Sequence, residues 1–218
     1  MSIALSIGNN LTTGGVFTAD AVNNTSVTNV TDFASVPGGG VLKLLSTQTA
    51  SASATIDFTS GIDSTYDSYV FKFYDIHPST NSANFTFQAD TGTNTNYNLT
   101  ITSTSFEAYH TEADDDTGLT YNATRDQAQG TAFAHLGCGG TSSDNDSSMA
   151  GTLQIFNPSS STYVKHYIAV NNTTNYDNLN LVKYVAGYGN TTSPVDAIKF
   201  QMSSGNIDSG QILLFGVN

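Results

Sequence analysis

The stretch from Ala54 to Ile76 limits the possible folds of this chain more than any other. In its first part, apolar Ala54, Ile56 and Phe58 alternate with polar residues, which is typical of a strand with one buried face. A glycine and several Ser and Asp residues follow, as in a turn. The last part, Ser68 to Ile76, has apolar or aromatic side chains on both faces and predicts a strand that is covered on both sides. We therefore expect two long strands, joined by a turn, at the centre of a sheet.

Further strand patterns follow one another along the chain. The segment Phe200 to Ser209 repeats the first pattern, so the first and last hairpins are expected to be variants of one unit. Closely spaced strands without long helices indicate a sandwich or barrel. We predict an all-β fold, an antiparallel two-sheet jelly-roll-like sandwich. Strands are expected near residues 41–46, 52–59, 68–76, 83–89, 97–102, 105–110, 150–157, 163–171, 180–187, 195–203 and 211–217.

Two segments depart from this pattern. Residues 122–129 are the candidate for a short helix of one or two turns. The stretch from Thr111 to Ala150 has few strand signals and many Asp, Gly and Ser residues. Connections of this length are usually functional or disordered, so we expect a long loop here.

Residues 1–40 differ from the rest of the chain. Their apolar residues have no sustained helical period, and Pro37 followed by three glycines suggests a boundary. Two interpretations stay open: an extended arm that orders on a neighbouring surface, or a partly disordered tail. We predict an N-terminal arm at 1–40 and a β-sandwich domain at 41–218. The candidate anchors of the arm are Val16, Phe17, Val22, Val27, Val30 and Phe33.

The charge balance excludes some partners. Charged residues make up only 11% of the 218 residues, against a typical ~25%. The net charge is nevertheless −12, because 18 acidic residues face 6 basic ones. Phosphate contacts need clustered Lys and Arg, so nucleic acid and anionic membrane surfaces are not expected as partners.

Targeting signals and cysteine use indicate the compartment. The chain starts without a basic segment and has no apolar run of the ~18 residues that span a membrane. Its single cysteine, Cys138, cannot form an internal disulfide. We expect synthesis and assembly in a bacterial cytoplasm.

The densest polar cluster contains His110, Glu112, Asp114, Asp115 and Asp116. Calcium takes 6–8 oxygen ligands, so a run of carboxylates is a conceivable site. The run lacks the spacing and central glycine of a calcium loop, and a solvated acidic loop is the favoured interpretation. We expect no bound metal and no cofactor.

Catalytic patterns are weak. Cys138 and His135 have no partner at a known catalytic spacing. Glycoside hydrolysis needs two carboxylates about 5–10 Å apart. The candidates are the only two glutamates, Glu107 and Glu112, and aspartates in predicted strands such as Asp57, Asp75 and Asp196, but nothing selects a pair among them. No catalytic residue is predicted, and we do not expect an enzyme.

Several tyrosines lie near predicted loops or strand ends. An aromatic ring with a polar end suits carbohydrate or protein contacts, although ordinary packing at a sheet edge explains these positions equally well. The residues are Tyr97, Tyr109, Tyr121, Tyr176 and Tyr188, and the acidic Asp114, Asp115 and Asp116 are further candidate contact residues.

Three blocks, Ala54 to Pro78, Gly151 to His166 and Ala197 to Gly216, resemble jelly-roll virion structural proteins of marine tailed bacteriophages that are associated with tail fibres. The resemblance covers most of residues 41–218. It rests on scaffold motifs, so it implies a virion structural role and a jelly-roll-like domain but no catalytic residue. It also implies a homotrimer, because fibre and spike modules are commonly threefold.

We therefore expect a non-enzymatic tail-fibre or spike-type module for particle assembly and host attachment, located in the virion. Its expected partners are copies of itself, other virion proteins of the tail or capsid, and a host surface glycan or protein. The arm at 1–40 would dock onto the particle. A capsid decoration (cement) protein and a polysaccharide depolymerase are the alternatives.

Overall fold

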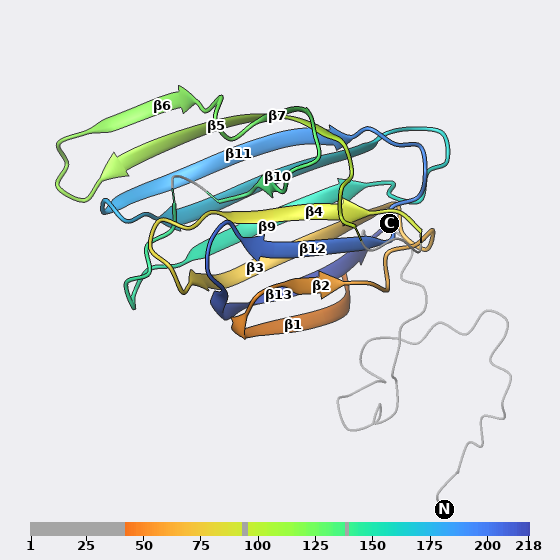
Figure 1. Cartoon of the computed structure of the whole chain (residues 1–218), viewed down its shortest axis with the longest axis horizontal. Helices are drawn as coiled ribbons and strands as arrows, with labels where there is room; N and C mark the ends of the chain where they lie inside the picture. Colours follow the sequence, from red (N-terminus) through yellow and green to blue (C-terminus); the bar gives the residue numbers. More distant parts are fainter. Residues whose placement is uncertain (1–41, 93–95, 138–139) are drawn as a thin grey trace, which may run out of the picture. The chain divides into compact units, whose positions relative to one another are not determined.

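The computed structural model describes residues 42–92, 96–137 and 140–218, which form thirteen β-strands and no helix (Figure 1). The predicted all-β class is confirmed. The strands are β1 (Lys43–Ser53), β2 (Ile56–Phe58), β3 (Ser68–Pro78), β4 (Phe85–Asp90), β5 (Ile101–Thr111), β6 (Thr117–Tyr121), β7 (Gln127–Gly130), β8 (Ala134–His135), β9 (Met149–Phe156), β10 (Lys165–Thr174), β11 (Leu179–Gly189), β12 (Ala197–Met202) and β13 (Ile207–Val217).

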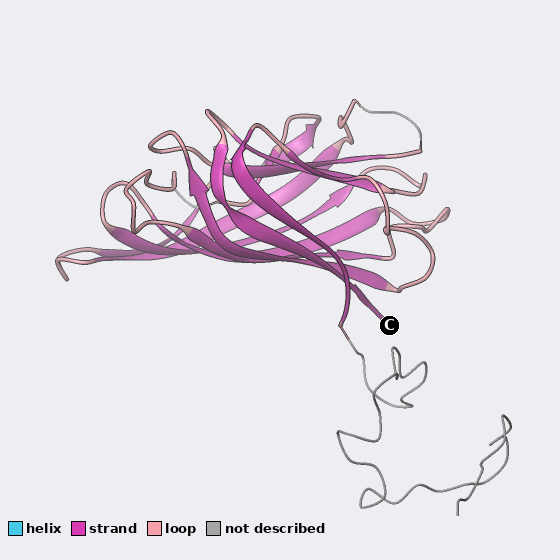
Figure 2. Ribbon diagram, turned by 90° about the horizontal axis from the view of Figure 1, so that it is seen from below, coloured by secondary structure: helices cyan, strands magenta, loops and turns pink. Residues whose placement is uncertain are grey.

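The strands form two antiparallel sheets that pack together, and Figure 2 shows these layers from another side. In the described part of the chain, the large sheet has nine strands in the order β1-β13-β3-β9-β10-β11-β5-β6, with β7 also paired to β5. The small sheet has four strands in the order β2-β12-β4-β8. The small sheet is too narrow to cover the whole large sheet.

The two parts of the Ala54–Ile76 stretch lie in different sheets, so the expected hairpin is wrong. β2 belongs to the small sheet and β3 to the large one, and the residues between them include Gly61 with a φ of +81°. The last unit of the chain repeats this arrangement with β12 and β13. Because β2 pairs with β12 and β3 pairs with β13, the two similar units lie side by side in both layers.

Aromatic rings fill the space between the sheets at this point. The ring of Phe200 lies 5.1 Å from that of Phe71, 5.4 Å from that of Phe73 and 5.5 Å from that of Phe85. Phe58 completes the cluster at 6.1 Å. All five side chains are buried, and most of the pairs meet edge to face, the geometry that aromatic quadrupoles favour.

Within the part of the chain that the structure describes, only one face of β3 is covered. Phe71 and Phe73 are buried, whereas Val70 and Lys72 are half-buried and Tyr74 is 46% exposed. The prediction of a strand covered on both sides is therefore wrong. The second face of β3 lies on the side of the large sheet that faces away from the small sheet.

Residues 131–137 and 140–142, which we call the covering segment, cover the part of the large sheet that the rest of the small sheet does not reach. The side-chain amide of Asn171 donates to the carbonyl of Leu136 (3.1 Å), and Nζ of Lys183 donates to the carbonyl of Gly137 (3.1 Å). From the other side, Nε2 of Gln88 donates to the carbonyls of Thr131 and Ala132. These hydrogen bonds hold a segment that has little regular structure of its own.

Between Thr111 and Ala150 the expected long loop is interrupted by β6, β7 and β8. The predicted helix at 122–129 is wrong, because part of it forms β7. These short strands depend on pairing with β5 or β4, a long-range contact that leaves little trace in the local sequence. The predicted strands at 97–102 and 105–110 are joined in β5.

Candidate functional site

The acidic cluster forms the turn between β5 and β6. The hydroxyl of Thr111 donates to Oδ1 of Asp115 (2.8 Å) and accepts the backbone N–H groups of Asp115 and Asp116 (3.1 Å each). Asp114 takes a φ of +58°, which aspartate tolerates better than most residues. The cluster is therefore built as a tight turn.

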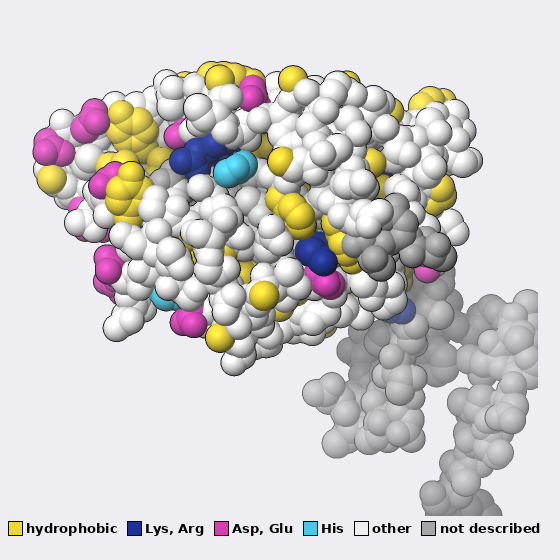
Figure 3. All heavy atoms as spheres, in the orientation of Figure 1, with side chains coloured by type: hydrophobic (Ala, Val, Ile, Leu, Met, Phe, Trp, Pro, Cys, Tyr) yellow, Lys and Arg dark blue, Asp and Glu magenta, His cyan; other side chains and the backbone are white. Residues whose placement is uncertain are grey.

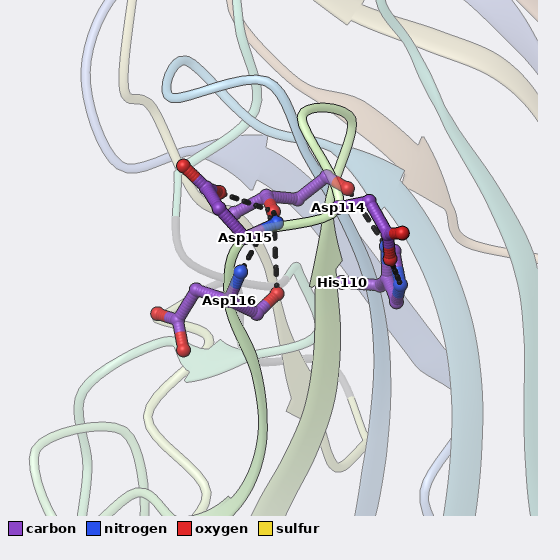
Figure 4. A network of polar contacts seen from close by, with 5 residues as sticks. His110, Asp114, Asp115 and Asp116 are labelled. Carbon is purple, nitrogen blue, oxygen red and sulfur yellow. Dashed lines mark hydrogen bonds and ion pairs between the residues drawn. The ribbon is translucent and has the colours of Figure 1, made fainter.

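The three carboxylates of this turn point in different directions (Figure 4). Oδ1 of Asp114 lies 3.1 Å from Nε2 of His110, and Oδ2 of Asp116 accepts the hydroxyl of Tyr109 at 3.3 Å. The charge of Asp116 raises the pKa of Tyr109. Within the described residues, no three or more His, Cys, Asp or Glu side chains gather as a group that could hold a metal. Each carboxylate of the turn is engaged locally.

The predicted contact tyrosines are spread over the domain. Tyr121 on β6 and Tyr188 on β11 lie on the open side of the large sheet, and the hydroxyl of Tyr121 donates to Asp126, which raises its pKa. Tyr176 is exposed in the turn between β10 and β11. Tyr109 lies on the other side of β5, and Tyr97 is buried with its ring 4.2 Å from Nζ of Lys199. The structure thus brings only two of the five to one surface.

The remaining sequence candidates have different positions. Glu107 points inward from β5 and is buried, whereas Glu112 is exposed in the acidic turn. Cys138 lies outside the described residues. The candidate anchors of the N-terminal arm also lie outside them: Val16, Phe17, Val22, Val27, Val30 and Phe33.

The open side of the large sheet is a broader candidate surface. We call it the outer face and define it by the alternate strand positions that point away from the small sheet. These are Leu44, Thr47 and Thr49 (β1); Gln211, Leu213, Phe215 and Val217 (β13); Val70, Lys72 and Tyr74 (β3); Ala150, Thr152, Gln154 and Phe156 (β9); His166, Ile168, Val170 and Asn172 (β10); Asn180, Val182, Tyr184, Ala186 and Tyr188 (β11); Thr102, Thr104, Phe106, Ala108 and His110 (β5); and Thr117, Leu119 and Tyr121 (β6).

Large apolar side chains are exposed along the outer face. Phe106 and Tyr184 are direct cross-strand partners whose rings stack at 5.0 Å with an interplanar angle of 8°. They are 44% and 41% exposed, while Ile168 is 50% and Leu119 is 73% exposed. Single exposed apolar residues are ordinary, but a contiguous set of them marks a contact surface.

A hollow of about 430 Å³ lies within the outer face. The hollow lies where β9, β10, β11 and β5 run side by side. The outer-face residues around it are mainly apolar and include Phe156, Ile168, Ala186 and Tyr188. It can accept an apolar side chain.

The outer face carries few charges. Among its described residues none is Asp or Glu, and only Lys72 carries a formal charge, with Nζ 5.3 Å from the ring of Phe215. Two neighbouring carboxylates contact it along β5 and β6, because Asp114 lies beside His110 and Asp126 accepts the hydroxyl of Tyr121. Other acidic side chains gather at the left end of β5 and β6 in Figure 3. The centres of protein interfaces are likewise depleted of charged residues.

A second hollow of about 430 Å³ is polar and lies where β3 and β13 change register. Asp75, Asp146 and Asp208 line it together with His77. Nδ1 of His77 lies 3.8 Å from Oδ2 of Asp208, and Nε2 lies 3.1 Å from the carbonyl of Asp144. The sequence does not predict that these aspartates meet, because they come from three distant segments of the chain.

The sequence signal for the outer face is the second apolar side of β3, with Val70 and Tyr74. That pattern predicts that other residues bury this face, but none of the described residues of this chain does so. A strand face that is apolar in the sequence can be buried inside the domain or against another molecule, and the local sequence does not distinguish these two cases.

No protein-family model, no curated protein and no solved structure matches this chain. In the ranges that the structure describes, no helix is long and apolar enough to cross a membrane. The resemblance to phage virion proteins stays a prediction from the sequence.

Proposed function

We propose that this chain is a non-enzymatic structural protein of a bacteriophage virion, a tail-fibre or spike-type module that assembles as a homotrimer and attaches to the host. The observation that carries the proposal is the outer face, a broad surface with exposed apolar side chains and no Asp or Glu among its residues, which suits contact between proteins. The virion context comes from the three sequence blocks that resemble phage proteins.

The positions of these blocks support a scaffold role. Ala54–Pro78 contains β2 and β3, Ala197–Gly216 contains β12 and most of β13, and Gly151–His166 contains most of β9 and the start of β10. Together they form the β2–β12 pair of the small sheet and the adjacent strands β13, β3 and β9 of the large sheet. The segments between these blocks contain the rest of both sheets, including β4, β5 and β11.

Location in the particle tests the proposal directly. A reconstruction of the virion, with the subunit identified by labelled antibody, should place this chain in the tail. Copies distributed over the icosahedral lattice of the head would contradict the tail role and support a capsid decoration protein.

The predicted N-terminal anchor has its own test. A chain that lacks residues 1–36 should keep the far-ultraviolet circular dichroism of a β-protein but fail to join the particle. Normal incorporation of the shortened chain would show that the arm is not the anchor.

Host attachment is tested with the full-length protein. Purified protein should bind host cells and reduce phage adsorption in a concentration-dependent way. Binding to host and non-host cells alike, without effect on adsorption, would contradict an adhesin role.

The polar hollow favours one second candidate function, hydrolysis of a polysaccharide. Paired carboxylates are the chemistry that glycosidases use, and Asp75, Asp146 and Asp208 gather there. Incubation with host surface glycan should release no oligosaccharide under the structural proposal. Release that is lost in Asp146→Asn or Asp208→Asn, but kept in Asp115→Asn in the acidic turn, would establish an enzyme instead.

A further inference from the structure

We propose that the outer face is the surface through which copies of this chain bind one another. This deepens the proposed function by naming the partner of its contact surface, and it rests on that function only for the virion context. Self-association is a property of the isolated chain, so it is tested independently of the particle.

The first observation is an incomplete burial pattern. A sheet that faces water on one side normally carries apolar residues inside and polar residues outside. Here Phe106, Ile168, Tyr184 and Leu119 stand on the outside at 41–73% exposure, distributed over four strands. Their positions follow the strand period of two, so they form a continuous face whose burial would release water from apolar surface.

Charge favours a second copy as the occupant. Two chains that each carry −12 repel one another, and contact is least opposed where neither presents a carboxylate. Most of the outer face meets this condition, because none of its residues is Asp or Glu and the carboxylates of Asp114 and Asp126 contact it only along β5 and β6. A basic partner would find no acidic residue on the rest of the face, and a polyanion would find a single lysine.

The area is sufficient for a stable contact. Eight strands spaced by about 4.8 Å, each with about eight residues of about 3.3 Å, span roughly 1,000 Å². A standard interface buries about 800 Å² on each partner, so even partial overlap of two faces reaches that size.

The relief of the outer face fits contact with itself. Leu119 and Tyr121 on β6 are 73% and 55% exposed, while the apolar hollow lies between β9 and β5. Each copy can therefore place an exposed apolar side chain of β6 in the hollow of the next copy, a head-to-tail contact that can close a ring of three.

The open edges of the large sheet offer a competing route. Among the described strands, β1 and β6 each have one neighbour in the sheet order, and exposed edges can pair with another chain. Edge pairing would satisfy backbone groups but would leave the apolar outer face in water. The face is therefore the better candidate.

The experiment measures the mass of the full-length chain by light scattering and sedimentation at about 50 µM, above the micromolar Kd of weak interfaces of this size. We expect a mass of three times 23.0 kDa. Ile168→Asp and Tyr184→Asp should each lower it to 23.0 kDa, because each buries a carboxylate at the contact. Tyr163→Asp is the matched control: Tyr163 is 70% exposed but lies in the turn between β9 and β10.

A dimer that behaves in the same way would also support the face as the interface. A monomeric wild type, or an oligomer that survives both face variants, would overturn the proposal. So would a monomer whose face variants lose host binding, since the face would then belong to the host contact. Circular dichroism and the unfolding midpoint confirm that the variants fold, and both positions are exposed enough to accept aspartate in a monomer.

Failure of this proposal is distinguishable from failure of the proposed function. An oligomer broken by the face variants in a protein that is absent from the virion would leave the interface intact and remove the virion role. A monomer found in the tail would support the virion role and contradict the outer face as an interface between copies.

Discussion

The two halves of the interior beneath the large sheet are built from different residues. Under the small sheet, β3 presents Tyr69, Phe71 and Phe73, and its neighbours β13 and β9 present aliphatic residues. We call this the aromatic half. On β10, β11 and β5 the same layer carries buried Asn171, Lys183 and Glu107, which occupy directly paired positions. We call this the polar half.

The polar half depends on specific hydrogen bonds. Asn171 and Lys183 donate to carbonyls of the covering segment, and Nδ2 of Asn122 donates to Oε1 of Glu107 at 3.1 Å. Buried polar groups need hydrogen-bond partners. The segment that covers the polar half is therefore held in the one position in which these hydrogen bonds form. We therefore expect the aromatic half to contribute most of the stability, whereas the polar half holds in place a segment with little strand pattern of its own.

The largest effect is expected in the aromatic half. Phe71→Ala removes a fully buried ring that contacts Phe58 and Phe200, and the free energy of unfolding should fall by about 3–5 kcal/mol. Urea unfolding measures the loss. A loss below about 1 kcal/mol would show that the aromatic half is not the main source of stability.

In the polar half, Lys183→Met should lower the free energy of unfolding by about 3 kcal/mol, because Glu107 would stay buried opposite a neutral side chain. Adding Glu107→Gln should recover most of this loss, since glutamine keeps an acceptor for Asn122. Additive losses in the double variant would mean that the two charges do not interact.

The pH dependence of stability should come partly from His135 in the cover. Burial, with the cations Lys183 and Arg125 nearby, lowers the pKa of His135 from 6.5 to about 4. Between these values the unfolded chain binds a proton that the folded chain does not, so the free energy of unfolding falls as pH falls through this window. For this partly exposed side chain we expect about 1–3 kcal/mol.

His135→Gln should flatten this part of the pH profile in urea unfolding between pH 7 and pH 4. Acidic groups elsewhere titrate in both proteins, so the difference between the two profiles isolates the histidine. Parallel pH profiles of the two proteins would mean that the ring of His135 is exposed to water in the folded protein.

The smallest effect is expected outside both halves. Ile168→Thr on the outer face should change the free energy of unfolding of the dilute monomer by about 0.5 kcal/mol or less, because the side chain is 50% exposed there. A loss comparable to that of Phe71→Ala would show that the face is already buried in the dilute protein.

Much of the local structure could be predicted from the sequence. The alternation along Tyr163–Asn171 matches β10, and the turn at Asn157–Thr162 is closed by the N–H of Ser160 on the carbonyl of Asn157 (3.1 Å). The Ser, Gly and Asp residues around Gly61 also correctly predicted a turn after β2. These features depend on neighbours in the chain, which the sequence displays directly.

The candidate sites could be predicted less well. The acidic turn could be recognised in the sequence as a run of acidic residues. Its carboxylates point in different directions because of how the chain turns at Asp114, and the sequence does not show this. The polar hollow and the outer face join residues from strands far apart in the sequence. Only the register of β10, β11 and β5 places Val170, Tyr184 and Phe106 in one row.

The sequence by itself determined that this chain is all-β and that a strand such as β3 has two apolar faces, because side chains alternate along a strand whatever surrounds it. The tertiary structure decided which face is covered. β2 crosses to a second sheet, the small sheet reaches only part of the large one, and residues 131–137 and 140–142 cover the remainder. Burial is a relation between distant segments, so none of the described segments covers the outer face of β3, although its sequence is that of a core strand.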